Sequence, residues 1–143
     1  MQNKKIKNKK LILGWLRKAE DDLAFAESSF KETEFYDHIC FLAEQAVEKY
    51  LKVIIIISKG RLSKKERTHN LIYLSSLCKE ADLDLSDFER NLRELSGAYI
   101  PARYPSDSYV TFNSEEAKQC LNSAQEIINF IKNKIDFSIY YRN

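Results

Sequence analysis

The sequence predicts an all-α protein, an up-and-down bundle of about five helices, and three observations lead to this prediction. The 143 residues include only 3 glycines and 2 prolines, which favours long uninterrupted elements over many turns. Apolar residues recur along several segments at alternating spacings of four and three, the period of an amphipathic helix. Hydrophobic residues make up 44% of the chain and charged residues 31%, which provides both a core and a solvated surface.

The segment 35–58 is the helix around which the others are expected to pack. It carries two adjacent apolar stripes, so it should be covered on two sides, and polar residues lie between the stripes. The β-branched run 53–57, taken alone, favours a buried strand. The helical period nevertheless continues into this run without Gly or Pro, so we predict a helix. The stripes are Ile39, Ala43, Ala46, Tyr50 and Ile54, and Cys40, Val47, Leu51, Ile55 and Ser58.

The helix before this central one is expected to begin near Lys10 or Leu11. The polar link that follows it, residues 31–34, is short, so the first two helices should be antiparallel neighbours. Gly60 is suited to end the central helix. The apolar seam of the first helix is Ile12, Leu16, Ala19, Leu23, Ala26 and Phe30.

A third and a fourth helix are expected after the polar loop 59–67. Thr68 is placed to cap the third, at about 69–81. Ser86 and Glu89 have the spacing of a capping box that opens the fourth. The core faces are Leu71, Leu74, Leu77 and Cys78 in the third helix, and Phe88, Leu92, Leu95 and Tyr99 in the fourth.

Residues 100–113 contain both prolines and are predicted to form an irregular loop before the fifth helix. Asn113 and Glu116 have capping-box spacing at its start. The stripe of this last helix is Ala117, Leu121, Ala124, Ile128, Ile131 and Ile135.

Charge separates a tail from the folded body. Residues 1–10 contain five lysines and no acid, so the formal net charge of +2 falls to −3 when these lysines are left out. We expect a basic flexible tail at 1–10, a helical bundle at 11–135 and a C-terminal tail at 136–143. The basic tail either solubilises the protein or contacts a polyanion such as RNA, and the lack of aromatic residues for base stacking favours the first role.

Membrane, disulfide and metal features are not expected. No run reaches the roughly 20 apolar residues of a membrane span, and residues 11–16 lack the features of a signal peptide. The scattered Cys40, Cys78 and Cys120 indicate reduced core thiols of a cytoplasmic protein. The acids Asp21, Asp22, Glu44 and Glu48 lack the Glu-x-x-His spacing of di-metal bundles, so we predict no metal and no cofactor.

Four short motifs follow one another along the chain. They are A-x-x-D-L-x-x-A at 19–26, F-x-A-x-Q-A-x-E-K-x-L-K at 41–52, His69 with Leu71, and A-R-Y-P at 102–105. Together they resemble the HEPN domain, a family of small prokaryotic all-α proteins, over about 14–134. The resemblance implies a bundle of about five helices that is often a homodimer. It also implies that the gene lies beside the gene of a minimal nucleotidyltransferase, and that the protein acts in a toxin–antitoxin or nucleotide-handling system.

The best known activity that this resemblance implies is metal-independent RNA cleavage by the motif R-x4-6-H. The chain departs from that motif. Its only histidines are His38 and His69. Arg61 precedes His69 by eight positions and Arg67 by two, and no histidine follows Arg103. The nuclease residues are therefore not carried over. A divergent ribonuclease that uses His69 with Arg67 or Arg103 stays an alternative.

Six residues are candidates for binding a ligand or partner. His69 either contacts an anion at a helix N-terminus or bonds a neighbouring element structurally. The Arg103 loop either provides interface and nucleotide contacts or is pinned to the bundle by Glu48. Lys52 either binds an anion or forms an i, i+4 pair with Glu48. The six residues are Lys49, Lys52, His69, Tyr99, Arg103 and Tyr104.

The function predicted first is a binding module, an accessory HEPN protein. Its expected partners are a second copy of itself, a small nucleotidyltransferase, and a nucleotide or RNA in its groove. The alternatives are the divergent ribonuclease toxin and a purely structural helical dimer.

Overall fold

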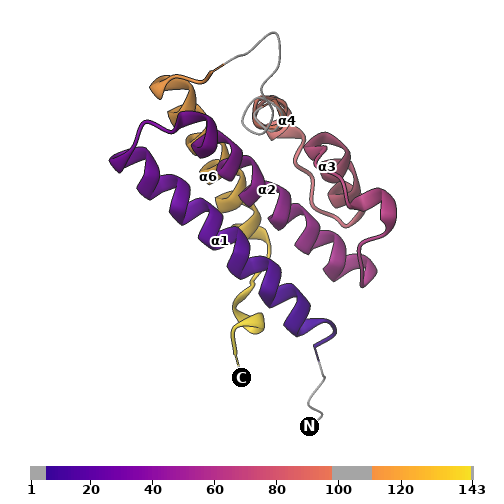
Figure 1. Cartoon of the computed structure of the whole chain (residues 1–143). Coiled ribbons are helices and arrows are strands. Elements are labelled where there is room, and N and C mark those ends of the chain that lie inside the picture. Colours follow the sequence, from indigo (N-terminus) through magenta and orange to yellow (C-terminus); the bar gives the residue numbers. More distant parts are fainter. Residues whose placement is uncertain (1–5, 98–110, 143) are drawn as a thin grey trace.

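The computed structural model describes residues 6–97 and 111–142, and over these ranges it contains five α-helices and no strand (Figure 1). The predicted all-α bundle of about five helices is confirmed. α2 lies at its centre and contacts each of the other four. The helices are α1 (Lys9–Glu32), α2 (Tyr36–Lys59), α3 (Leu71–Glu80), α4 (Glu89–Ser96) and α6 (Ser114–Lys134).

The helices α1 and α2 form an antiparallel hairpin, as the short link predicted (Figure 1). Thr33 ends α1 by donating its hydroxyl to the carbonyl of Ser29 at 2.7 Å. At the other end of the hairpin, the side-chain amide of Asn8 donates to the carbonyl of Gly60 at 2.6 Å. The start of α1 is thus tied to the end of α2.

The central helix is buried on two sides, and the segment 53–56 is helical and buried, so the strand alternative for this run does not occur. Gly60 ends the helix with φ 89°, a left-handed conformation that glycine adopts without steric cost. The prediction for the β-branched run and for the helix end is therefore confirmed.

Two predicted helix caps are wrong. The N-cap of α3 is Asn70, whose side-chain oxygen accepts the N–H of Tyr73 at 3.1 Å, while the hydroxyl of Thr68 accepts the N–H of Asn70. Ser86 forms no capping box because its N–H bonds the carboxylate of Asp84, and a 3-10 turn at 86–88 precedes α4. At α3 the neighbouring Asn70 takes the capping role, while before α4 the carboxylate of Asp84 takes the Ser86 N–H that a capping box would have bonded to Glu89.

The last long helix, α6, runs in the same direction as α2. Its predicted capping box is present: Asn113 accepts the N–H of Glu116 at 2.8 Å, and Glu116 accepts the N–H of Asn113 at 3.0 Å. The carboxylate of Asp37 at the start of α2 accepts the N–H of Phe112 at 2.7 Å. This bond joins the first turn of α2 to the chain entering α6.

The C-terminal segment packs on the bundle. Phe137 and Tyr140 are buried, and the ring of Phe137 lies 5.9 Å from the ring of Tyr50 between centroids. The three cysteines are buried with free thiols. None of the helices in the described ranges is long and apolar enough to span a bilayer. The division into tails and body stays a prediction, and residues 1–5 of the basic tail lie outside the described residues.

Candidate functional site

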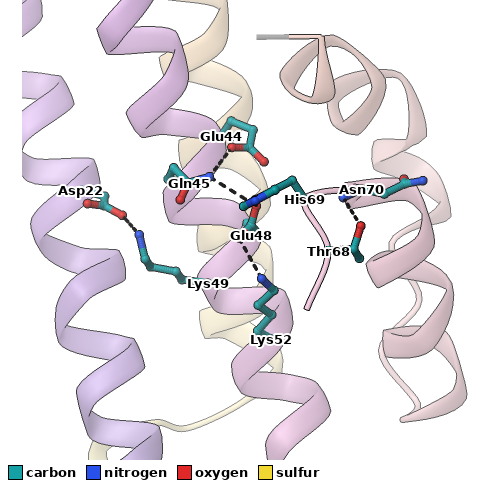
Figure 2. A network of polar contacts seen from close by, with 9 residues as sticks. All are labelled: Asp22, Glu44, Gln45, Glu48, Lys49, Lys52, Thr68, His69 and Asn70. Atoms are coloured by element: carbon teal, nitrogen blue, oxygen red, sulfur yellow. Dashed lines mark hydrogen bonds and ion pairs between the residues drawn. The ribbon is translucent and has the colours of Figure 1, made fainter. Parts of the chain in front are cut away.

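A network of polar side chains crosses the middle of α2 and joins it to α1 and to the loop before α3 (Figure 2). Glu48 is at its centre, and we call it the Glu48 network. Its members are Glu44, Gln45, Glu48, Lys49 and Lys52 from α2, Asp22 from α1, and His69 from the loop.

Helical spacing explains why three of these groups share one face. Glu44, Glu48 and Lys52 are four residues apart, so their side chains follow one another along the helix. They lie between the two apolar stripes, where α3 and α4 pack on one side and α1 on the other. All three are buried, with 0%, 3% and 5% of their surface exposed.

The carboxylate of Glu48 has three partners. Its Oε2 accepts from Nζ of Lys52 at 2.9 Å. Its Oε1 accepts from Nδ1 of His69 at 2.8 Å and from the side-chain amide of Gln45 at 3.3 Å. A buried carboxylate is tolerated only when its lone pairs are satisfied in this way. The contact also places the proton of His69 on Nδ1, since a carboxylate accepts.

Glu44 differs from Glu48 in its surroundings. Its Oε2 accepts from Gln45 at 2.7 Å, but its Oε1 is buried without a hydrogen-bond partner. Burial, and then the negative charge of Glu48, raise the pKa of Glu44 to about 9. Glu44 is therefore a neutral carboxylic acid near pH 7.

The lysines of the network face carboxylates. Lys49 forms a close ion pair with Asp22, which joins α2 to α1. Lys52, besides its bond to Glu48, lies 5.7 Å from the centroid of the Trp15 ring. The i, i+4 pair of Glu48 with Lys52, which the spacing had offered as one alternative, is present.

The structure brings together three of the residues that the sequence singled out, Lys49, Lys52 and His69. Arg67 is exposed and lines a separate groove with Trp15 and Lys52. The other three candidates, Tyr99, Arg103 and Tyr104, lie outside the described residues.

Sequence reasoning underrated Glu44, Gln45 and Glu48, which form the core of the network. The available signal was polar residues at i, i+4 spacing inside a helix that is apolar on both sides. Polar residues at this spacing are either buried and paired with one another, or they form a solvent-exposed strip along the helix. Among the residues that the structure describes, no group of three His, Cys, Asp or Glu side chains is placed to hold a metal ion.

The sequence model of the HEPN domain matches residues 12–134. The chain belongs to the HEPN domain family. No protein of curated function matches it. The family resemblance noted from the four ordered motifs is confirmed, and so is the all-α architecture.

Two solved structures are similar to this HEPN protein over nearly all of their length. One is TT1696 from Thermus thermophilus, with 28% sequence identity and a TM-score of 0.69 over 87% of this chain and 98% of that one. The other is ST0689, described as an archaeal HEPN homologue. It has 26% identity and a TM-score of 0.62 over 86% of this chain and 96% of that one.

Proposed function

We propose that this HEPN protein is a cytoplasmic binding subunit that pairs with a minimal nucleotidyltransferase and with a second copy of itself, in a toxin–antitoxin or nucleotide-handling system. A nucleotide or RNA is the ligand expected in this setting. Family membership and the missing R-x4-6-H spacing support this proposal.

The observation that carries the proposal is the internal charge balance of the Glu48 network. Lys49 pairs with Asp22, and Lys52 pairs with Glu48. RNA cleavage needs cations directed at the phosphate that gains charge in the transition state. Cations already paired with carboxylates are poorly suited to that task. They instead order an internal polar network, with His69 about half exposed at its edge.

A tagged full-length protein, isolated from its native host without nuclease treatment, tests the proposal. Mass spectrometry identifies bound proteins, and the ratio of absorbance at 260 and 280 nm reports bound nucleic acid. Recovery of a small nucleotidyltransferase, with or without bound nucleic acid, is the expected result. RNA recovered without any protein partner contradicts the proposal.

The divergent ribonuclease is the second candidate, and one contact favours it. A carboxylate behind an imidazole fixes the orientation and tautomer of the ring, and Glu48 contacts His69 in this way at 2.8 Å. Cleavage of RNA that is lost in both His69→Ala and Glu48→Gln, and unchanged in His38→Ala, would establish this activity. If RNA stays intact with and without the partner, the ribonuclease is excluded.

A further inference from the structure

We propose that a groove beside Trp15 docks an acidic, amphipathic segment of a protein partner. The inference rests on the proposed binding role and deepens it by naming the surface and the chemistry of what it holds. The groove lies between α1, the end of α2 and the loop 60–67, and has a volume of about 750 Å³. We call it the Trp15 groove.

The rim of the Trp15 groove is positively charged. Arg61, Lys64 and Arg67 line it, and all three are exposed. None of the described residues that line it is acidic. Three cations on one short loop attract a partner that carries carboxylates at matching positions.

The one acid of this loop is turned inward and orders it. Glu66 is 1% exposed, pairs closely with Lys59, and accepts the N–H of Ser63 at 2.7 Å. Together with Ser63 it forms a capping box around the 3-10 turn Lys64–Glu66. The acid therefore fixes the loop without cancelling the charge of the groove.

The floor of the groove is apolar. Leu11 is 47% exposed, Leu62 is half-buried, and Ile56 lies beneath them. An exposed leucine in a groove rimmed by cations fits a hydrophobic anchor flanked by acids, the pattern of a helix bound in a groove.

Trp15 makes a protein segment a better occupant than RNA. The ammonium group of Lys52 lies over the Trp15 ring, 5.7 Å from its centroid, so it occupies a ring face on which a base would otherwise stack. Lys52 is held in turn by Glu48 and is 5% exposed. Single-stranded nucleic acid is bound by open aromatic faces on which bases stack, and no other aromatic side chain among the described residues lines this groove.

Fluorescence anisotropy with the full-length protein tests the proposal. The probe is a labelled helical peptide of about 12 residues, with leucine at i, i+3, i+4 and i+7 and glutamate elsewhere. Two matched peptides replace either the leucines by serine or the glutamates by glutamine, and a single-stranded RNA of similar length is the fourth probe. We expect only the acidic, leucine-bearing peptide to bind, and to bind more weakly as salt is raised.

Variants of the groove locate the binding. The double variant Arg61→Glu, Arg67→Glu should weaken the peptide about tenfold or more. Lys65→Glu, compared with Arg67→Glu alone at the same change of charge, is the control, since Lys65 is exposed in the same loop but does not line the groove. Circular dichroism should show unchanged helix content in both variants.

Three results of the binding assays overturn the proposal. They are no binding of the acidic, leucine-bearing peptide, equal loss in the Lys65→Glu control, and RNA binding that is tighter than peptide binding and lost in the double variant. The native-host isolation separates this inference from the proposed function. If a nucleotidyltransferase still copurifies with the double variant, the Trp15 groove is refuted as the docking site, while the proposed function stands. If the peptide binds the wild-type protein but no natural partner is recovered, the proposed function is refuted, while the groove stands.

Discussion

Two neighbouring segments of α2, residues 44–52 and residues 53–56, are both largely buried but differ in chemistry. The first segment contains Glu44, Glu48 and Lys52, all at most 5% exposed. The second segment, the run 53–56, is apolar throughout and at most 3% exposed. Burial of a large apolar side chain stabilises a fold by about 1.5–3 kcal/mol. Burial of charged groups costs free energy that their pairing only partly returns.

The difference shows that burial alone does not assign a role to a residue in this helix. The apolar segment accounts for stability without further explanation. The polar segment is arranged around one carboxylate and reaches the surface at His69. The predictions below test how differently the two segments contribute to stability.

Glu48→Ala should produce the largest effect. It leaves Lys52 buried and without its carboxylate, and breaking a buried ion pair from one side costs about 3–5 kcal/mol. Urea unfolding followed by circular dichroism measures the change. The double variant Glu48→Ala, Lys52→Met should recover much of the loss, because it removes the uncompensated charge. A double variant no more stable than the single one would contradict this account.

Ile55→Ala should have the second largest effect on the free energy of unfolding, and this effect should involve no charge. Ile55 is 1% exposed, and truncation of a buried isoleucine costs about 2–5 kcal/mol through lost transfer energy and a residual cavity. The loss should be independent of pH. Ile57→Ala is the control from the same run, because Ile57 is 40% exposed. Equal losses in the two variants would show that the run is not packed as described.

Glu44→Gln should change how stability depends on pH. The pKa of Glu44 is raised to about 9 in the folded protein from 4.5, so between these values the folded state holds a proton that the unfolded state has lost. The wild-type free energy of unfolding should therefore fall as pH rises, by up to about 1.4 kcal/mol per pH unit. Glu44→Gln, which cannot ionise, should lose this slope.

Urea unfolding at several pH values between 5 and 9 checks the slope, with about six points spaced to resolve a change of one pH unit. The charged and polar groups next to Glu44 are Glu48, Lys49 and Gln45, and they are kept in both proteins. Parallel curves for the wild type and the variant would contradict a raised pKa at Glu44.

Lys49→Met should have the smallest effect of the four. Its pair with Asp22 is only partly buried, with side chains 16% and 20% exposed, and such pairs contribute about 1 kcal/mol or less. Thermal unfolding at low and high salt measures the change, which salt should reduce further. A loss as large as that of Glu48→Ala would show that the network is centred on α1 rather than on Glu48.

Most of the fold could be predicted from local pattern. The period of apolar residues placed the five helices of the described ranges, and it correctly outweighed the β-branching of residues 53–57. Asn113 and Glu116 were recognised as a cap because both partners lie within one turn. The cap at Thr68 was wrong because Asn70, two residues later, accepts the N–H of Tyr73 and starts α3, and the cap at Ser86 was wrong because Asp84 accepts the N–H of Ser86. Spacing alone does not rank such local acceptors.

The site was less predictable than the fold. Lys49, Lys52 and His69 were selected from residue type and family likeness, and the structure joins them in one network. The depth of Glu44 and Glu48 depends on how α1, α3 and α4 pack against α2, which is a long-range property of the chain. A polar residue between two apolar stripes looks the same in the sequence whether it is solvated or enclosed.

The β-branched run that completes α2 also has a consequence for the chain before it folds. Residues 53–57 are five consecutive β-branched apolar residues without Pro or charge, a segment that forms intermolecular β-structure when exposed. Lys52 and Lys59 flank it closely and oppose such assembly by repulsion. Refolding from urea should therefore lose yield to aggregation as protein concentration rises, measured by light scattering. Ile57→Lys should restore that yield at little cost to the folded state, because the side chain at 57 is partly solvent-exposed in the folded protein. The same segment thus supplies an apolar part of the native core and promotes aggregation of the unfolded chain.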